Sequence, residues 1–201
     1  MSGILLTGIV GGMNLKWNQV AEVIDGDTFV LGNGQKVRML GIDAPELEYC
    51  GGEEARKELE DKILGEKVKL SQLKIDQYRR ILALVYLDKS LVNEEMLKSG
   101  WVKWDGTRNG EEEKLKEAAN RAKEEKVGVY KACRGPDKKE CIIKGNIEKR
   151  SGESDGGRKL YFYPGCSEYE AVIVEKELGE EWFCTTKEAE EKGYQKAANC
   201  W

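Results

Sequence analysis

Two segments near the N-terminus place acidic residues at the ends of apolar, β-branched stretches. The segments are residues 23–28 and 37–46, and we interpret both as strands joined through the turn Gly-Asn-Gly at 32–34. Asp27, Asp43 and Glu46 lie where the chain turns, a position that directs side chains into a cleft. Because carboxylates packed together repel one another, the pattern predicts a hard divalent cation with oxygen ligands.

Ordinary surface acids are the alternative interpretation. In a chain with 35% charged residues, any one of these acids is as easily a solvated side chain as a ligand. The set favours a site, because both groups of acids stand at strand ends.

The chain of 201 residues contains no histidine. This excludes histidine-based catalytic triads, histidine-containing zinc sites and the usual proton shuttle at neutral pH. The formal net charge is −4, so a polyanionic partner must be met by a local basic site.

The six cysteines are an even number and contain no CxxC pair, which favours three disulfides over a thioredoxin motif or zinc ribbon. They are Cys50, Cys133, Cys141, Cys166, Cys184 and Cys200. An extracellular or cell-surface location is therefore expected. Abundant Glu and Lys with few Gln is a weak thermophile-like signature, and in a hyperthermophile a cytoplasmic location stays open.

Residues 1–17 form a mildly apolar lead, too short in its apolar part to span a bilayer and without a basic start. It is either the remnant of a signal or anchor or a sequence added during cloning. No transmembrane span is expected.

Periodicity predicts helices over 53–64, 94–99 and 111–125, and strands over 68–71 and 81–87. Asn93 is expected to cap the second helix, and Gly100 to end it. Short strands with inserted helices predict a mainly β fold with packed helices, in the form of a five-stranded OB barrel.

A change of composition near Cys133 predicts a second domain. We expect the barrel domain over 18–133, a linker over 134–140 that carries Gly and Pro, and a cysteine-rich α+β module over 141–201. The module has an aromatic strand at 160–163 and a last helix that starts at the capping box Thr185 with Glu188. So short a unit needs cross-links or a metal to be stable.

The motifs of the first domain, in their order, resemble the staphylococcal nuclease (thermonuclease) family. They are Val-Ile-Asp-Gly-Asp-Thr at 23–28, Arg38, Gly-Ile-Asp-Ala-Pro-Glu at 41–46, Asp-Gln-Tyr-Arg-Arg at 76–80, Val-Asn-Glu at 92–94 and Gly-Trp-Val-Lys at 100–103. The resemblance runs from about residue 20 to 130. It implies an OB-fold phosphodiesterase that uses calcium to cleave DNA and RNA.

By this resemblance, Asp27 and Asp43 bind calcium through their carboxylates and Ala44 through its backbone carbonyl. Glu46 orients or deprotonates the attacking water. The founding nuclease carries threonine at the position of Ala44, a mild departure because the main-chain oxygen is the expected ligand.

The resemblance also assigns the phosphate to Arg38 and Arg80, and the wall of the nucleotide pocket to Tyr78. Arg79 is the neighbouring alternative to Arg80. Salt bridges of Arg38 with Asp27 and of Arg80 with Asp76 are the plain structural alternatives. Trp101 and Trp104 are most simply core or cleft-edge aromatics, although Trp104 in a cleft can stack on a base.

The tail carries a pattern of cysteines, glycines and aromatic residues at 141–147, 161–166, 179–184 and 200. In this pattern it resembles a small module that follows such domains in some secreted bacterial nucleases. Phe162 stands where that module usually has a histidine, which counts against a histidine-assisted zinc site. A four-cysteine zinc site stays open as the alternative, but disulfides among these cysteines are favoured. The expected pairs are Cys166 with Cys184 and Cys141 with Cys200. Cys50 and Cys133 remain as the pair of the barrel domain, and closing so long a loop contributes roughly 4 kcal/mol on the chain-entropy model.

The resemblance favours a monomeric calcium-dependent nuclease of low sequence specificity that acts on single-stranded or frayed DNA or RNA. Two alternatives stay open: a non-catalytic OB module that only binds nucleic acid, and a nuclease whose cysteine-rich tail binds it to a surface or partner.

Overall fold

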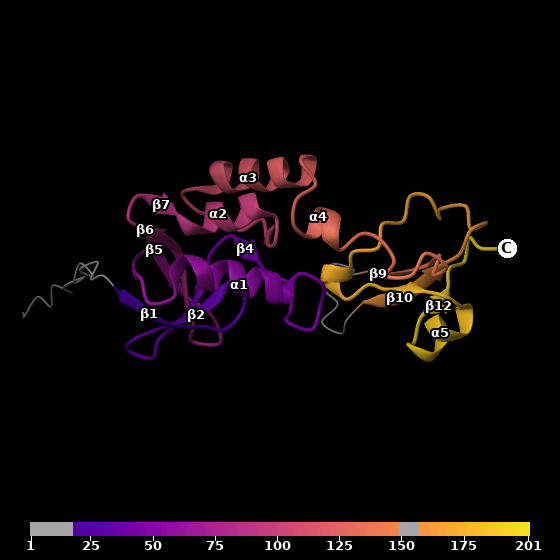
Figure 1. Ribbon diagram of the computed structural model, residues 1–201, viewed down its shortest axis with the longest axis horizontal. Coiled ribbons are helices and arrows are strands. Elements are labelled where there is room, and N and C mark those ends of the chain that lie inside the picture. Colours follow the sequence, from indigo (N-terminus) through magenta and orange to yellow (C-terminus); the bar gives the residue numbers. More distant parts are fainter. Residues whose placement is uncertain (1–17, 149–156) are drawn as a thin grey trace, which may run out of the picture.

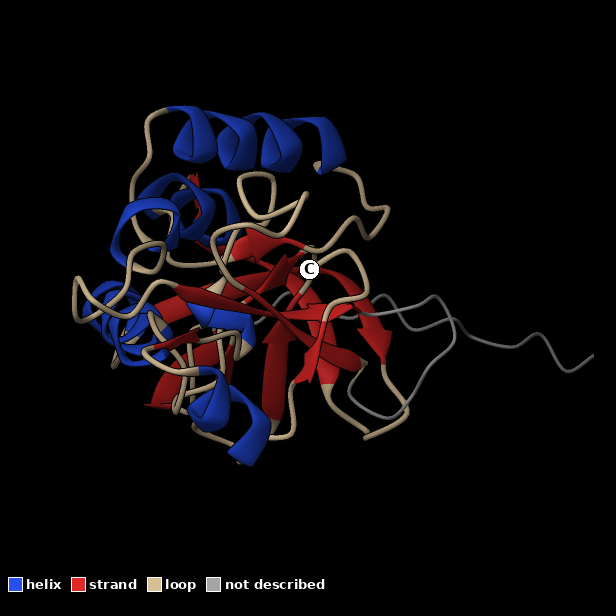
Figure 2. Ribbon diagram, turned by 90° about the vertical axis from the view of Figure 1, so that its right-hand side faces the viewer, coloured by secondary structure: helices blue, strands red, loops and turns tan. Residues whose placement is uncertain are grey.

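The computed structural model describes residues 18–148 and 157–201. The predicted N-terminal lead, 1–17, lies outside these residues. Figure 1 shows two parts side by side along the long axis, a barrel with its helices and a smaller C-terminal part, with α4 (Val129–Ala132) next to the junction. Viewed from the C-terminal end, the strands lie in the middle and helices at the periphery (Figure 2).

Five strands form a closed barrel, as predicted. β1 (Asn18–Val23) pairs antiparallel with β2 (Thr28–Leu31) and with β5 (Lys67–Ile75). β2 continues to β3 (Lys36–Met39), and β5 to β6 (Ile81–Leu87), both antiparallel. The parallel pairing of β3 with β6 closes the barrel, and the short β7 (Ser90–Leu91) extends its edge. The OB-type fold is confirmed.

Three helices cover the barrel: α1 (Gly52–Ile63), α2 (Val92–Ser99) and α3 (Glu112–Glu124). Each sits within two residues of its predicted start, because the apolar positions recur at helical spacing and face one aliphatic core. On α1 the buried residues are Ala55, Leu59 and Ile63, one per turn. Gly100 ends α2 in the left-handed region, as expected.

Two local predictions were wrong. Residues 24–27 are a turn rather than part of a strand, because Asp25 accepts a hydrogen bond from the Asp27 amide and bends the chain. Asn93 is no cap: it lies inside α2, fully buried, and its side chain bridges the Val85 amide and the Leu40 carbonyl at 2.8 Å each. Its amide satisfies backbone groups of the barrel that water does not reach.

A two-stranded ribbon stands apart from the barrel ladder. It consists of β4 (Ile42–Asp43) and β8 (Lys103–Trp104), which pair antiparallel with Asp43 opposite Lys103. The predicted acidic residue Asp43 is therefore carried by this ribbon.

The C-terminal part has a four-stranded sheet of order β11-β9-β10-β12. Its strands are β9 (Ile143–Glu148), β10 (Arg158–Phe162), β11 (Trp182–Phe183) and β12 (Gln195–Lys196). A 3-10 turn, η1 (Lys176–Leu178), and α5 (Thr186–Glu191) complete it. The capping box is confirmed, since Thr185 accepts a bond from the Glu188 amide.

All six cysteines form disulfides, and Cys50–Cys133 is paired as expected. The other two expected pairs were wrong: the structure joins Cys141 to Cys184 and Cys166 to Cys200. The sheet order is the reason. β11 pairs with β9, which brings residue 184 beside 141, whereas β12 runs parallel to β10 and carries residue 200 toward 166.

Among the described residues, no helix combines the length and apolar character required to cross a bilayer.

Candidate functional site

The turn between β1 and β2 presents Asp27, and Gly26 allows it to pack closely. A Cβ atom on Gly26 would lie 2.4 Å from the Cβ of Ala55 in α1 and 2.9 Å from the Cβ of Ala44. The absent side chain lets the turn approach both the helix and the segment after β4. Glycine in the Asp-Gly-Asp motif thus has a steric reason.

The Asp27 carboxylate is buried and connects three segments. Its Oδ1 accepts hydrogen bonds from the Thr28 hydroxyl at 2.8 Å and from Arg38 at 2.7 Å. Its Oδ2 accepts one from the Ala44 amide at 2.9 Å. Burial raises the pKa of Asp27 to about 7 against the lowering effect of Arg38 and these bonds, and the nearby Asp25 adds to the rise.

Arg38 on β3 joins the two acids that the sequence singled out. Its guanidinium donates to Asp27 at 2.7 Å and to Asp43 at 2.5 Å. Burial opposes its charge, but the two carboxylates outweigh burial and raise the pKa of Arg38. The ion pair of Arg38 with Asp27, one of the plain alternatives above, is therefore present, and it is part of a triplet.

The donor chemistry of this triplet fits a hard cation. Asp27 and Asp43 converge on one positive group, and the side chain of Asp43 is 57% exposed, so solvent and ions reach it. The Ala44 backbone is held beside them by its amide bond to Asp27. Among the described residues, however, no three acidic or cysteine side chains are grouped closely enough to form a metal site by themselves. Calcium binding stays a prediction.

Arg80 follows the tight turn before β6 and pairs with Asp76. Asp76 accepts from the Arg80 amide at 2.9 Å and from its Nε at 2.7 Å. Partial desolvation opposes ionisation of Asp76, yet the bonds from Arg80 lower its pKa. The Arg80 guanidinium carbon lies 5.4 Å from the centre of the Tyr78 ring, and this ring is not a packing group, because Tyr78 is 70% exposed.

Arg38, Tyr78 and Arg80 line one pocket of about 420 Å³. Arg80, and not Arg79, is among the lining residues, which supports the register chosen from the motif. The remaining lining residues are Met39, Leu40, Asp76, Gln77, Leu82, Asp105 and Thr107. Three predicted substrate-binding side chains, Arg38 from β3 and Tyr78 and Arg80 from the turn before β6, therefore share one cavity.

Glu46 lies apart from this hydrogen-bonded group. It is exposed at the start of the turn that leads into α1, and its backbone carbonyl accepts from the Tyr49 amide at 2.9 Å. Gly52 packs against this carbonyl, since a Cβ there would lie 2.2 Å from the oxygen. Among the described residues, no hydrogen bond joins the Glu46 carboxylate to Asp27, Asp43 or Arg38. Its role stays a prediction.

Sequence reasoning missed several residues that support the site. Thr28 and Asp25 bind Asp27 or its backbone, and Asp105 with Thr107 line the pocket. Thr28 and Asp25 stand inside the 23–28 motif, so their closeness to Asp27 was a usable signal. Asp105 and Thr107 follow β8, where the Asp-Gly-Thr turn marks a loop at the strand end.

Comparisons with known proteins agree with this geometry. The model of staphylococcal nuclease homologues matches residues 36–132. An uncharacterised endonuclease of Haemophilus influenzae is 40% identical over 86 residues, 41% of this chain and 48% of that protein. A probable endonuclease LCL3 of Komagataella phaffii is 32% identical over 142 residues, 62% of each chain. The thermonuclease of Staphylococcus hyicus is 34% identical over 110 residues, 49% of this chain and 65% of that enzyme.

The chain thus spans about half to two thirds of the length of these curated relatives. The family match itself ends at residue 132, so the C-terminal part lies beyond it.

Proposed function

Residues 36–132 of this chain match the staphylococcal nuclease family, and from this we propose that the protein is a nuclease that hydrolyses phosphodiester bonds of DNA or RNA. The observation that carries the proposal is the meeting of Arg38, Arg80 and Tyr78 at one pocket beside Asp27 and Asp43. A module that only binds nucleic acid has no need of a buried carboxylate bonded to one of these arginines.

The two arginines act on the phosphate. Attack at phosphorus increases negative charge on the non-bridging oxygens, and guanidinium groups aimed at them stabilise that charge more than the ground state. Arg38 uses two of its N–H groups on Asp27 and Asp43 and keeps others for a phosphate. Asp76 engages the Nε of Arg80, which leaves the terminal nitrogens facing the pocket. Each planar fork then offers paired donors to one phosphate group.

Calcium is the cation that we propose for this site, held by Asp27, Asp43 and the carbonyl of Ala44. When bound, it supplies positive charge next to the scissile phosphate. The protein's part is to hold the two carboxylates together, which Arg38, Thr28 and the Ala44 amide do in the structure.

Glu46 is the proposed acceptor for the proton of the attacking water. With no histidine in the chain, a carboxylate is the available group for this task. Its exposure on a turn packed against Gly52 gives its carboxylate access to water, and it follows Asp43 and Ala44 by two to three residues in sequence.

We propose low sequence specificity and a preference for single-stranded or frayed substrates. The exposed ring of Tyr78 offers a face on which any unpaired base can stack. The three disulfides support an oxidising compartment, extracellular or at the cell surface.

Digestion of end-labelled single-stranded DNA, duplex DNA and RNA across a calcium titration tests the proposal. We expect cleavage that requires calcium, stops with a chelator and is fastest on single strands. Binding of the same substrates without cleavage at any calcium concentration would establish the non-catalytic alternative instead.

A further inference from the structure

The segment 43–50 carries much of the proposed site, namely Asp43, Ala44 and Glu46. It lies outside the barrel ladder: within the described residues, β4 has β8 as its only strand partner. A two-residue ribbon is weakly held by its own hydrogen bonds. What holds β8 and the turn after β4 therefore decides how precisely these residues are placed.

The C-terminal part holds β8 through charge. Lys103, directly opposite Asp43, places its Nζ 2.8 Å from Glu175 and 2.7 Å from Glu177. Arg134 binds the same Glu177 carboxylate with both terminal nitrogens, at 2.5 and 2.6 Å. Glu177 belongs to η1 and is only 1% exposed.

This network differs from a surface ion pair. The carboxylate of Glu177 is removed from water, and its two oxygens accept from one lysine and one arginine, so its bonding capacity is used. A solvent-exposed pair is weak and mobile, whereas loss of one partner from a buried set leaves the others charged and unpaired. Glu177 thus links η1 to β8, the strand that pairs with Asp43.

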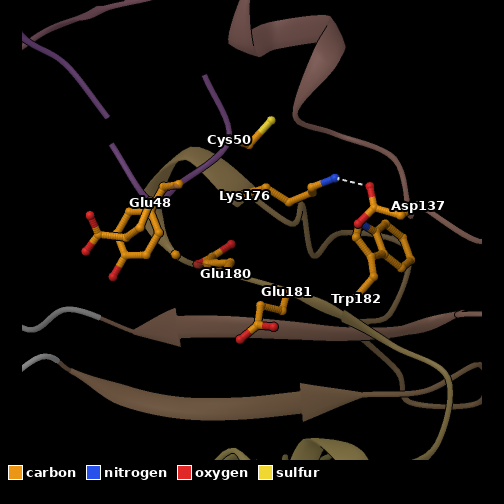
Figure 3. Close-up of a pocket in the computed structure, with 9 residues that line it drawn as sticks. Glu48, Cys50, Asp137, Lys176, Glu180, Glu181 and Trp182 are labelled. Atoms are coloured by element: carbon orange, nitrogen blue, oxygen red, sulfur yellow. Dashed lines mark hydrogen bonds and ion pairs between the residues drawn. The ribbon is translucent and has the colours of Figure 1, made fainter. Parts of the chain in front are cut away.

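A second contact reaches the turn that follows Glu46. The ring of Tyr49 packs on Gly179, where a Cβ atom would lie 2.8 Å from the Tyr49 Cζ. The Tyr49 amide donates to the Glu46 carbonyl at 2.9 Å, so the contact is one hydrogen bond away from Glu46. Figure 3 shows this junction, where Glu48 and Cys50 of the segment and Lys176, Glu180 and Trp182 of the C-terminal part line one cavity of about 340 Å³.

A third connection is covalent. Cys50 at the end of the segment is bonded to Cys133, whose carbonyl accepts from the Lys176 amide in η1 at 3.4 Å. One connection reaches the strand partner of Asp43, at the start of the segment, and the other two reach Tyr49 and Cys50 at its end. All three lead to residues 176–179.

We propose that the C-terminal part is a positioning element of the nuclease site, with Glu177 acting through Lys103 and Gly179 acting through Tyr49 to hold the segment 43–50. The inference rests on the proposed function for its effect on catalysis. The element lies beyond the residues that the family model matches, 36–132, so the inference concerns a part of the molecule outside the matched region.

The experiment compares the full chain with its Glu177→Gln and Glu148→Gln variants. Glu148 is the matched control, because it forms an exposed pair with Arg158 within the same C-terminal sheet. Two quantities are measured: amide hydrogen exchange in the metal-free protein, and kcat and KM on single-stranded DNA.

For Glu177→Gln we expect exchange at residues 42–50 and 103–104 to quicken about tenfold or more, with β1 and β2 unchanged. We expect kcat to fall about tenfold with KM within twofold, since misplacement by about 1 Å costs up to about a hundredfold in rate. Glu148→Gln should change none of these. A residue that only stabilises the fold would quicken exchange across the barrel and leave kcat of the folded fraction unaltered.

Native exchange at 42–50 together with native kcat in Glu177→Gln would overturn the inference. The measurement is informative even if this variant unfolds the C-terminal part. If the amides of residues 42–50 then still exchange as slowly as in the native chain, the C-terminal part does not position this segment. Hydrogen exchange can be measured without catalytic activity. If the native chain fails to cleave nucleic acid, the proposed function is refuted, but the positioning of residues 43–50 by the C-terminal part can still be tested.

Discussion

The barrel and the C-terminal part of this molecule are stabilised by different means. The barrel buries one continuous set of aliphatic side chains from its strands and from α1, α2 and α3. The C-terminal part has two small clusters built around aromatic rings and the cysteines Cys166 and Cys200. It adds two disulfides and charged groups that are buried with their partners.

Lys144 and Glu180 illustrate the second strategy. Lys144 is held by the carbonyls of Tyr169 and Val172, and burial lowers its pKa. Glu180 accepts from the Ile147 and Glu175 amides, and burial raises its pKa. A short chain that cannot bury enough apolar surface uses cross-links and satisfied polar groups instead. The larger part has an apolar core of its own and does not depend on such buried charges for most of its stability.

If the chemistry belongs to the barrel, Glu46→Gln should have the largest effect of any change discussed here. We expect turnover to fall by about 10²–10⁴, the usual contribution of a general base, with binding of calcium and a nucleotide retained. Steady-state kinetics and calorimetry measure the two properties. Glu48→Gln, an exposed acid on the same turn, is the control, and a near-native rate for Glu46→Gln would remove Glu46 from the mechanism.

The dependence of the C-terminal part on cross-links is tested by replacing Cys166 and Cys200 together with alanine. Loss of a native disulfide from so small a unit costs about 2–5 kcal/mol, and we expect this part to lose its amide protection. The Cys50→Ala/Cys133→Ala variant is the comparison, because the aliphatic core should keep the barrel folded. If either variant loses amide protection equally in the barrel and in the C-terminal part, the two parts do not differ in their dependence on disulfides.

Arg80→Ala probes the phosphate-binding side of the barrel. Removing one charged donor from the transition state should cost about 3 kcal/mol in kcat/KM. Its neighbour supplies the control, since Arg79 is exposed and does not line the pocket. A larger loss for Arg79→Ala would place the phosphate-binding arginine one residue earlier.

Asn93→Ala tests how far the barrel itself depends on a buried polar group. It leaves the Val85 amide and the Leu40 carbonyl without partners, and each unsatisfied group costs about 1–3 kcal/mol. Urea unfolding monitored by tryptophan fluorescence gives the free energy. Asn33→Ala, at an exposed turn, should change it by little, and equal effects of the two changes would show that the buried bonds contribute nothing special.

The smallest effect concerns the charged junction at low pH. Burial disfavours the ionised Glu177, but bonds from Arg134 and Lys103 outweigh burial and lower its pKa. Glu175, Glu180 and Tyr130 are further titratable groups near it. A lowered pKa means that the contribution to stability is complete above the ordinary glutamate value of about 4.3 and is lost as the pH falls through the folded value.

We therefore expect the melting temperature to fall more between pH 5.5 and 3.5 in the native chain than in Glu177→Gln, which has no charge to lose. Differential scanning calorimetry of both proteins measures this difference. Parallel pH profiles would mean that the junction does not depend on the ionisation of Glu177.

Prediction from the sequence succeeded where local patterns decide the structure. The apolar residues Ala55, Leu59 and Ile63 recur every four residues, a spacing typical of a helix with one buried face, and they form α1. The apolar run of residues 81–87 is typical of a buried strand, and it forms β6 of the barrel. The motif order also identified Asp27, Arg38 and Asp43, which the fold brings together.

Prediction from the sequence failed where the structure depends on contacts between residues far apart in the chain. Asn93 is a residue type that often caps helices, but here its side chain is buried and forms hydrogen bonds with the Val85 amide and the Leu40 carbonyl. The disulfide partners of Cys141 and Cys166 follow from the order of strands in the C-terminal sheet, which spacing along the chain does not encode. Glu177 carries no local signal at all, since its partners lie more than forty residues away in sequence.

The Cys50–Cys133 bond also turns the intervening chain into a covalent ring. A protease that cuts the exposed stretch around residues 105–110 opens the ring without releasing a fragment. Asp27, Arg38 and Arg80 would stay on one piece, and α3 with the C-terminal part on the other, still tied together by sulfur. Such a nicked molecule migrates as a single species until it is reduced.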